Sequence, residues 1–123
     1  MPKATLLICD DEPGVRDSLK LILEADYHLA FAADGEEAIL CAKSLKPDLA
    51  ILDIKMPRMN GLECLKKLKQ LEPKLKVLIL TGYESGDVAS EAVHLGAANY
   101  LTKPLERDKV LSAVQSLLTP PGP

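Results

Sequence analysis

Short apolar runs alternate with longer amphipathic stretches along this chain of 123 residues. Runs of roughly four to eight apolar residues bounded by turn residues are typical of strands buried in a parallel sheet. The second of these runs is the most polar and irregular, which favours a position at the edge of the sheet. The pattern predicts strands at residues 4–9, 28–33, 48–53, 76–81 and 97–102.

Apolar residues spaced three and four apart predict a helix after each strand. Asp34 with Glu37 has the spacing of a capping box and starts the second helix, which ends near Lys46-Pro47. Asn60 with Glu63 starts the third in the same way. The fourth runs from about Ser85 to Gly96, and the fifth follows Pro104. The residues expected to face inward are Val15, Leu19, Ile22 and Leu23 in the first helix, Leu62, Leu65 and Leu68 in the third, Val88, Ala92 and Leu95 in the fourth, and Val110, Val114 and Leu117 in the fifth.

Strands and helices that alternate over short loops predict an α/β fold with right-handed crossovers. Five such units suit a flavodoxin-like, doubly wound (βα)5 three-layer sandwich, with a parallel five-stranded sheet of order 2-1-3-4-5. We expect one domain at residues 1–118. The remainder, 119–123, is rich in proline and is expected to form a tail or the start of an interdomain linker.

Composition excludes several classes of function. The net charge is −3, and the basic residues are scattered, so we expect no direct nucleic acid binding. Three distant cysteines provide no zinc or dithiol motif, and Cys9 is expected to be a small core residue. Reduced thiols, the absence of a leader-like start and the lack of a membrane-length apolar run favour a cytoplasmic protein with no membrane contact.

Polar residues of a particular kind end four of the predicted strands. Asp10-Asp11 follows the first strand, Asp53 ends the third, Thr81 ends the fourth and Lys103 follows the fifth. In open parallel sheets, functional groups collect beyond the carboxyl ends of the strands, and the switch point here lies between the first and third. The four strand ends therefore predict one site with three carboxylates, a hydroxyl and an ammonium.

Three clustered carboxylates need a positive partner, because two unit charges about 5 Å apart repel by roughly 3 kcal/mol at an effective dielectric of 20. Mg²⁺ is the natural guest, since it prefers carboxylate oxygens and is often completed by a phosphate oxygen. Lys103 supplies a second positive charge. A carboxylate beside both is able to act as a nucleophile towards phosphorus and form an acyl phosphate.

Each of these residues has a simpler interpretation when it is taken alone. Asp10 or Asp11 is a natural N-cap for the following helix, Thr81 suits a turn, and Lys103 suits the surface. Asp53 is harder to explain in this way, because it ends a buried run and is not followed directly by a helix. The joint placement of all five favours a site for phosphoryl chemistry.

The segments that carry these residues resemble the receiver domain of bacterial two-component response regulators. The resemblance extends from about Lys3 to Leu118. The matching segments are Ile8–Glu12, Leu52–Pro57 with Asn60-Gly61, Leu80–Gly82 and Tyr100–Pro104.

The resemblance implies a phosphorylation-activated signalling switch. Asp53 would accept a phosphoryl group from a sensor histidine kinase, and the chain would catalyse only its own phosphotransfer and dephosphorylation. Asp10, Asp11, Asp53 and the backbone carbonyl of Lys55 would bind Mg²⁺.

The resemblance also assigns residues around the phosphoryl group. Thr81 and Lys103 would stabilise it, and Thr81 with Tyr100 would form the switch. The fourth helix, fifth strand and fifth helix would pass the signal on, with a possible homodimer through the same face. Three residues, Pro57, Gly61 and Pro104, would be structural elements near the site, with a cis bond before Pro104.

Alternatives remain for the wider role. The segment 11–16 most resembles receivers that precede an ATPase and a DNA-binding domain, which predicts an output domain in transcription regulation. A stand-alone receiver or a docking module is the alternative. A hydrolase of the haloacid-dehalogenase type would need an acid where Lys55 stands, and a flavodoxin would need a Thr-, Ser- and Gly-rich loop in place of the acidic segment 10–12.

Overall fold

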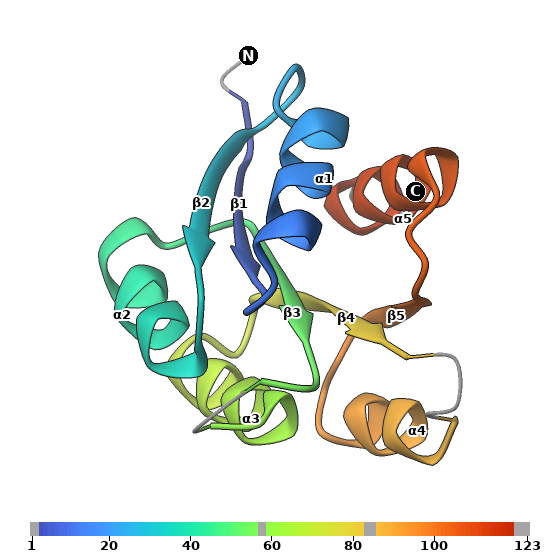
Figure 1. The fold of residues 1–123 in the computed structure, drawn as a ribbon. Coiled ribbons are helices and arrows are strands. Elements are labelled where there is room, and N and C mark those ends of the chain that lie inside the picture. The colour runs from blue at the N-terminus through green and yellow to red at the C-terminus, as the bar shows by residue number, and fades with distance from the viewer. Residues whose placement is uncertain (1–2, 57–58, 83–85, 120–123) are drawn as a thin grey trace.

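Strands and helices alternate along the computed structural model, which describes residues 3–56, 59–82 and 86–119 (Figure 1). The predicted positions of Pro57, of the first residues of the fourth helix near Ser85 and of the tail from residue 120 lie outside the described residues. The elements are β1 (Thr5–Cys9), α1 (Pro13–Leu23), β2 (His28–Ala32), α2 (Gly35–Leu45), β3 (Leu49–Asp53), α3 (Gly61–Leu71), β4 (Lys76–Thr81), α4 (Gly86–His94), β5 (Asn99–Thr102) and α5 (Arg107–Leu118).

The strands form one five-stranded parallel sheet in the order β2-β1-β3-β4-β5, as predicted, with β2 at an edge. Cys9 pairs with Leu52 across β1 and β3, and Thr81 pairs with Thr102 across β4 and β5. This register brings the residues that end β1, β3, β4 and β5 to one edge of the sheet. Helices α1 and α5 cover one face, and α2, α3 and α4 cover the other (Figure 1).

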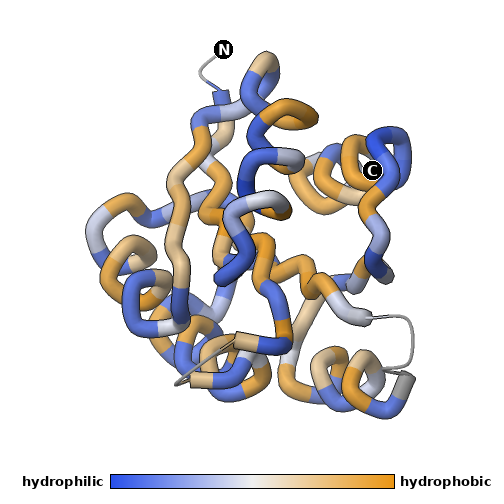
Figure 2. Tube along the Cα trace, viewed as in Figure 1, coloured by the Kyte–Doolittle hydropathy of each residue, from blue (hydrophilic) through white to orange (hydrophobic). Residues whose placement is uncertain are grey.

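The alternation of side chains along each strand divides the core into two layers. Ile8 and Ile51 face α1 and α5, where Leu19 and Val110 are fully buried. Their strand neighbours face α2, α3 and α4 instead. Apolar residues accordingly run through the central strands in Figure 2, with no alternation of polar positions. Both faces of this sheet are therefore buried.

Most of the predicted inward positions face the core, with differences in depth. Leu62, Val88 and Leu95 pack against it but stay partly exposed, whereas Cys64 and Ala89 are buried. Leu62 is thus less buried than predicted. The spacing of the leucines alone did not show that Cys64 lies on the buried side of the helix. Cys9 is a buried core residue, as expected.

Local hydrogen bonds explain where the helices begin. Asp34 accepts from the backbone N–H of Glu37 at 2.9 Å, which caps α2 as predicted. Asn60 caps α3 in the same way. The N-cap of α1 is Glu12, without a capping side-chain bond, so the interpretation of Asp10 or Asp11 as that cap is wrong. Among the described residues, no helix is long and apolar enough to span a bilayer.

Gly61 lies against the backbone that follows β3. A Cβ atom at this position would lie 2.3 Å from the Ile54 Cα and 2.4 Å from the Asp53 carbonyl oxygen, and the Gly61 N–H donates to the Ile54 carbonyl at 2.7 Å. Neither neighbour is a side chain that can rotate away. The absence of a side chain therefore lets α3 start directly beside Asp53.

Substitution Gly61→Ala is expected to destabilise the fold by about 1–3 kcal/mol, because the backbone near Asp53 must shift. Gly14→Ala is the matched control, since nothing lies within 4 Å of its added Cβ. That change in α1 should leave stability unchanged or raise it by up to about 1 kcal/mol. Urea unfolding of both variants tests this, and equal effects would contradict the close-approach argument.

Candidate functional site

A cavity of about 390 Å³ opens at the carboxyl ends of β1, β3 and β4. Five of the residues that the sequence predicted for the site line this cavity, and they lie at or just after the ends of four different strands. The polar strand ends therefore meet, as the sheet order requires. The lining residues are Asp11, Glu12, Asp53, Ile54, Lys55, Thr81, Gly82 and Lys103.

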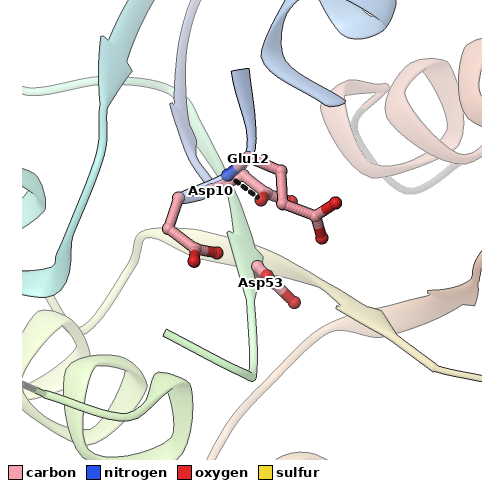
Figure 3. Close-up of side chains that lie close together, drawn as sticks. Asp10, Glu12 and Asp53 are labelled. Atoms are coloured by element: carbon pink, nitrogen blue, oxygen red, sulfur yellow. Dashed lines mark hydrogen bonds between the residues drawn. The ribbon is translucent and has the colours of Figure 1, made fainter. Parts of the chain in front are cut away.

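Four carboxylates converge at this edge (Figure 3). One oxygen from each of Asp10, Asp11, Glu12 and Asp53 lies within 4.8 Å of the others. Asp10 is 0% exposed and Asp53 is 4% exposed, whereas Asp11 and Glu12 are open to solvent. The sequence prediction did not include Glu12, although its place directly after two acids was a usable signal.

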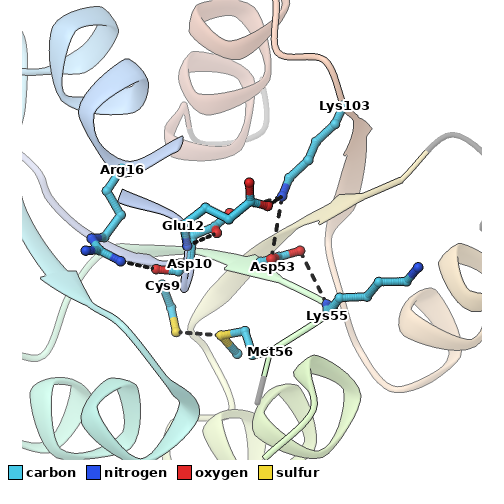
Figure 4. A network of polar contacts seen from close by, with 8 residues as sticks. All are labelled: Cys9, Asp10, Glu12, Arg16, Asp53, Lys55, Met56 and Lys103. Carbon is cyan, nitrogen blue, oxygen red and sulfur yellow. Dashed lines mark hydrogen bonds and ion pairs between the residues drawn. The ribbon is translucent and has the colours of Figure 1, made fainter. Parts of the chain in front are cut away.

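Lys103 is the positive partner of this cluster (Figure 4). Its Nζ lies 3.3 Å from Asp10 Oδ2, 3.3 Å from Glu12 Oε1 and 3.5 Å from Asp53 Oδ2. Its backbone N–H donates to the Thr81 carbonyl at 2.8 Å, which holds the end of β5 beside β4. One ammonium therefore serves three carboxylates.

The balance of charge shifts three pKa values. Burial, and secondly the charge of Asp10, raise the pKa of Asp53 to about 6, against the lowering effect of Lys103. Burial also raises the pKa of Asp10, although the Glu12 N–H and Lys103 oppose this. Burial lowers the pKa of Lys103, but Asp53 and Asp10 outweigh it and the net pKa is raised. The buried carboxylates are thus under-compensated by the lysine.

The donor set fits a hard divalent cation. Asp10 Oδ2 is buried and accepts no hydrogen bond among the described residues, and Lys103 Nζ, 3.3 Å away, is its ion-pair partner. Among the described residues, Asp53 Oδ1 accepts one long bond of 3.3 Å, from the Lys55 N–H, and the Lys55 side chain points away from Asp53 (Figure 4). Oxygen donors of this kind, with net negative charge, are those that Mg²⁺ prefers.

The remaining predicted residues lie around the cavity. Thr81 is 3% exposed at the end of β4, and Tyr100 on β5 is 44% exposed, with its side chain at the surface. The bond between Lys103 and Pro104 is cis, as expected. Cys9 and Met56 connect β1 with the loop after β3 through a 3.3 Å contact between their sulfur atoms (Figure 4).

A family model described as the response regulator receiver domain matches residues 6–115. The chain belongs to this family. As a receiver domain it is a signalling switch of two-component systems rather than a conventional enzyme. The acidic cluster lies where the sheet topology of this family brings the carboxyl ends of the strands together.

Relatives of this receiver differ in length. Sporulation initiation phosphotransferase F of Bacillus subtilis is 34% identical over 119 residues, which cover 96% of this chain and 96% of the relative. Transcriptional regulatory protein LnrK of the same organism is 36% identical over 115 residues, which cover 91% of this chain but 52% of LnrK. A receiver of this kind therefore occurs both nearly alone and as about half of a longer regulator.

Solved structures show the same fold. Chemotaxis protein CheY4 of Vibrio cholerae has a TM-score of 0.88 and 31% identity, over 94% of this chain and 99% of that chain. NtrX of Brucella abortus, solved in complex with ADP, has a TM-score of 0.90 and 28% identity, over 94% of this chain and 27% of that chain. The flavodoxin-like receiver architecture is thus confirmed.

The raised pKa of Asp53 predicts a pH-dependent stability. The pKa of Asp53 is about 6 in the folded chain and about 3.8 in the unfolded chain, so the folded state binds more protons between these values. Stability should therefore fall as pH rises from 4 to 6, by about 2 kcal/mol from this residue alone. Asp53→Asn should remove that contribution and be more stable than the wild type at pH 7, but not at pH 4.

Urea unfolding in the presence of a chelator, at pH 4, 5, 6 and 7, measures this difference. Asp17→Asn on the exposed side of α1 is the control, and its difference from the wild type should be smaller. A wild type as stable as Asp53→Asn at pH 7 would contradict the electrostatic account.

Proposed function

We propose that this receiver accepts a phosphoryl group on Asp53 from a sensor histidine kinase, with Mg²⁺ bound beside it. The observation that carries the proposal is the position of Asp53, nearly buried at the cavity and in contact with both the Lys103 ammonium and the Lys55 N–H. Asp10, which is fully buried, is not among the residues that line the cavity.

The Asp53 carboxylate is the nucleophile in the proposed transfer. A bond forms between its oxygen and phosphorus while the bond from phosphorus to the kinase imidazole breaks, and the imidazole leaves with the electron pair. Lys103 pairs with the phosphoryl oxygens, and the Thr81 hydroxyl donates a hydrogen bond to one of them. Positioning and charge neutralisation supply most of the catalysis in such transfers.

Asp10, Asp11, Asp53 and the backbone carbonyl of Lys55 are the proposed magnesium ligands. Their fit is supported by the convergent carboxylate oxygens and by Asp10 Oδ2, which is buried and accepts no hydrogen bond among the described residues. The bound cation would offset the negative charge that gathers on the phosphoryl group and on the carboxylates.

Thr81 and Tyr100 are proposed to convert phosphorylation into a change of surface. Movement of Thr81 towards a phosphoryl group vacates space near β5, into which the exposed Tyr100 ring is able to turn. Such a switch is a shift between two populations, driven by contacts that the phosphoryl group makes in only one of them. The surface affected is formed by α4, β5 and α5.

The same surface is the proposed site of self-association. Exposed charges of both signs lie on this surface: Arg107, Asp108 and Lys109 near the start of α5, and Asp87 and Glu91 on α4. Such pairs set register across a two-fold contact but contribute only about 0–1 kcal/mol each, so association should weaken with salt. Sedimentation with and without beryllofluoride, at low and high salt, measures it.

The wider role is proposed to be transcription regulation through an output domain, of the kind that carries ATPase and DNA-binding parts. Residues 1–118 form the receiver in this proposal, and 119–123 begin the linker. Support comes from LnrK, in which the segment that matches this chain makes up 52% of the length. A stand-alone relay in the cytoplasm is the second candidate, because sporulation initiation phosphotransferase F matches over 96% of its length.

Phosphorylation at Asp53 is tested with acetyl phosphate. In the presence of Mg²⁺ the intact mass should increase by one phosphate, and Asp53→Asn should abolish the increase because the nucleophile is lost. Asp17→Asn should be labelled like the wild type. Excess chelator should prevent labelling. Full labelling of Asp53→Asn, or labelling that chelator leaves unchanged, would reject the assignment of the acceptor or of the metal.

The switch is tested by hydrogen exchange with beryllofluoride, which stands in for the phosphoryl group. Exchange should change in peptides that cover residues 86–101, because Thr81 and Tyr100 border α4 and β5, and should stay constant in the second half of α1. Thr81→Ala should reduce the change. Identical exchange in this region with and without the mimic would count against the proposed switch.

A further inference from the structure

Arg16 is a basic residue outside the acidic cluster that contacts the cluster's backbone. It lies in the first turn of α1, and its Nη1 donates to the backbone carbonyl of Asp10 at 2.7 Å (Figure 4). Among the described residues, no backbone N–H donates to this carbonyl, because the ladder of β1 ends at Cys9. Charge-assisted hydrogen bonds of this length are stronger than neutral ones.

The other polar groups of Asp10 are held as well. Its N–H donates to the Ala32 carbonyl at 3.1 Å, and its Oδ1 accepts from the Glu12 N–H at 2.9 Å. With the contact from Arg16, three hydrogen bonds fix the backbone and one oxygen of Asp10. The remaining oxygen, Oδ2, faces the cluster with the Lys103 ion pair and no hydrogen bond.

The contact from Arg16 also acts on the next residue. The Asp10 carbonyl and the Asp11 nitrogen belong to one planar peptide group. A hydrogen bond that fixes the carbonyl therefore also fixes the orientation of the Asp11 N–H. Arg16 in turn is held by α1, where its N–H donates to the Glu12 carbonyl at 3.2 Å. The side chain therefore closes a ring over the loop that carries three of the four clustered acids.

We propose that Arg16 is a positioning residue for magnesium, which orients the loop from Asp10 to Glu12 so that its carboxylates meet the geometry of the ion. The inference rests on the proposed magnesium site. Mg²⁺ demands near-ideal octahedral coordination at about 2.0–2.1 Å, whereas Ca²⁺ accepts longer and more variable arrangements. Loss of the hydrogen bond from Arg16 should therefore lower the affinity of the loop for Mg²⁺ more than its affinity for Ca²⁺.

An effect of charge and an effect of positioning predict opposite changes in Mg²⁺ affinity when Arg16 is removed. The guanidinium is permanently positive and repels a nearby cation, so if Arg16 acted by charge alone, its removal would strengthen magnesium binding. If it acts by orienting the loop, its removal weakens binding despite the lost repulsion. The sign of the change separates the two explanations.

The experiment titrates Mg²⁺ into the unphosphorylated chain by calorimetry at fixed ionic strength. Arg16→Ala should weaken binding roughly ten-fold, as loss of an outer-sphere partner does at other metal sites. Arg16→Lys and Arg16→Gln keep a donor and should recover part of the loss. Lys20→Ala removes an exposed charge one turn further along α1 and should bind Mg²⁺ as the wild type does, or slightly more tightly.

A parallel titration with Ca²⁺ separates positioning from general disorder of the loop. Arg16→Ala should lose less Ca²⁺ affinity than Mg²⁺ affinity. Equal losses for the two ions, or Mg²⁺ binding by Arg16→Ala as tight as in the wild type, would overturn the inference. Urea unfolding without metal shows whether each variant is folded, and if Arg16→Ala is not, Arg16→Gln carries the test. A wild type that binds no Mg²⁺ would instead reject the proposed magnesium site, and the inference with it.

Discussion

The sharing of one ammonium among three carboxylates is the interaction on which the site depends. Lys103 lies 3.3–3.5 Å from oxygens of Asp10, Glu12 and Asp53. It reaches them because β5 docks on β4, where its N–H meets the Thr81 carbonyl. Two acids at about 5 Å would otherwise repel by roughly 3 kcal/mol in a medium of dielectric 20. The site is therefore complete only when the last strand of the sheet is in place.

One lysine does not balance this charge, and the imbalance gives the site its chemistry. Burial and Asp10 hold the pKa of Asp53 near 6 in spite of Lys103. The buried Asp53 carboxylate is unfavourable as an isolated anion. Binding of a cation beside it, or a change in its own charge, therefore stabilises it most. Ligands shift an equilibrium only by their different affinities for two states. In the proposed function, the same repulsion that lowers stability would couple metal, phosphoryl group and conformation.

The sequence predicted the regular parts of the molecule, since these depend on short-range patterns. Strand order, the caps Asp34 and Asn60 and the meeting of polar strand ends all follow from hydrophobic period and turn residues. Arg16 was missed as part of the site because its role depends on how far a flexible side chain reaches between elements, whereas Glu12 was missed although its place directly after two acids is visible in the sequence. The simpler interpretation of Asp10 or Asp11 as the cap of α1, which applied only to each residue taken alone, fails because Asp10 makes other contacts in the cluster.

The unequal anchoring of the helices indicates where a signal can leave the site. Among its described residues, α4 buries only two small side chains, Ala89 and Ala92. Helix α3 buries the larger side chains of Leu65 and Leu68. Each buried CH₂ contributes about 0.8 kcal/mol, so α4 is held less firmly than its neighbour. Elements that move are drawn from the less stable parts of a fold. A rearrangement that begins at Thr81, as in the proposed switch, therefore meets less resistance towards α4, which follows β4 in the chain, than towards α3.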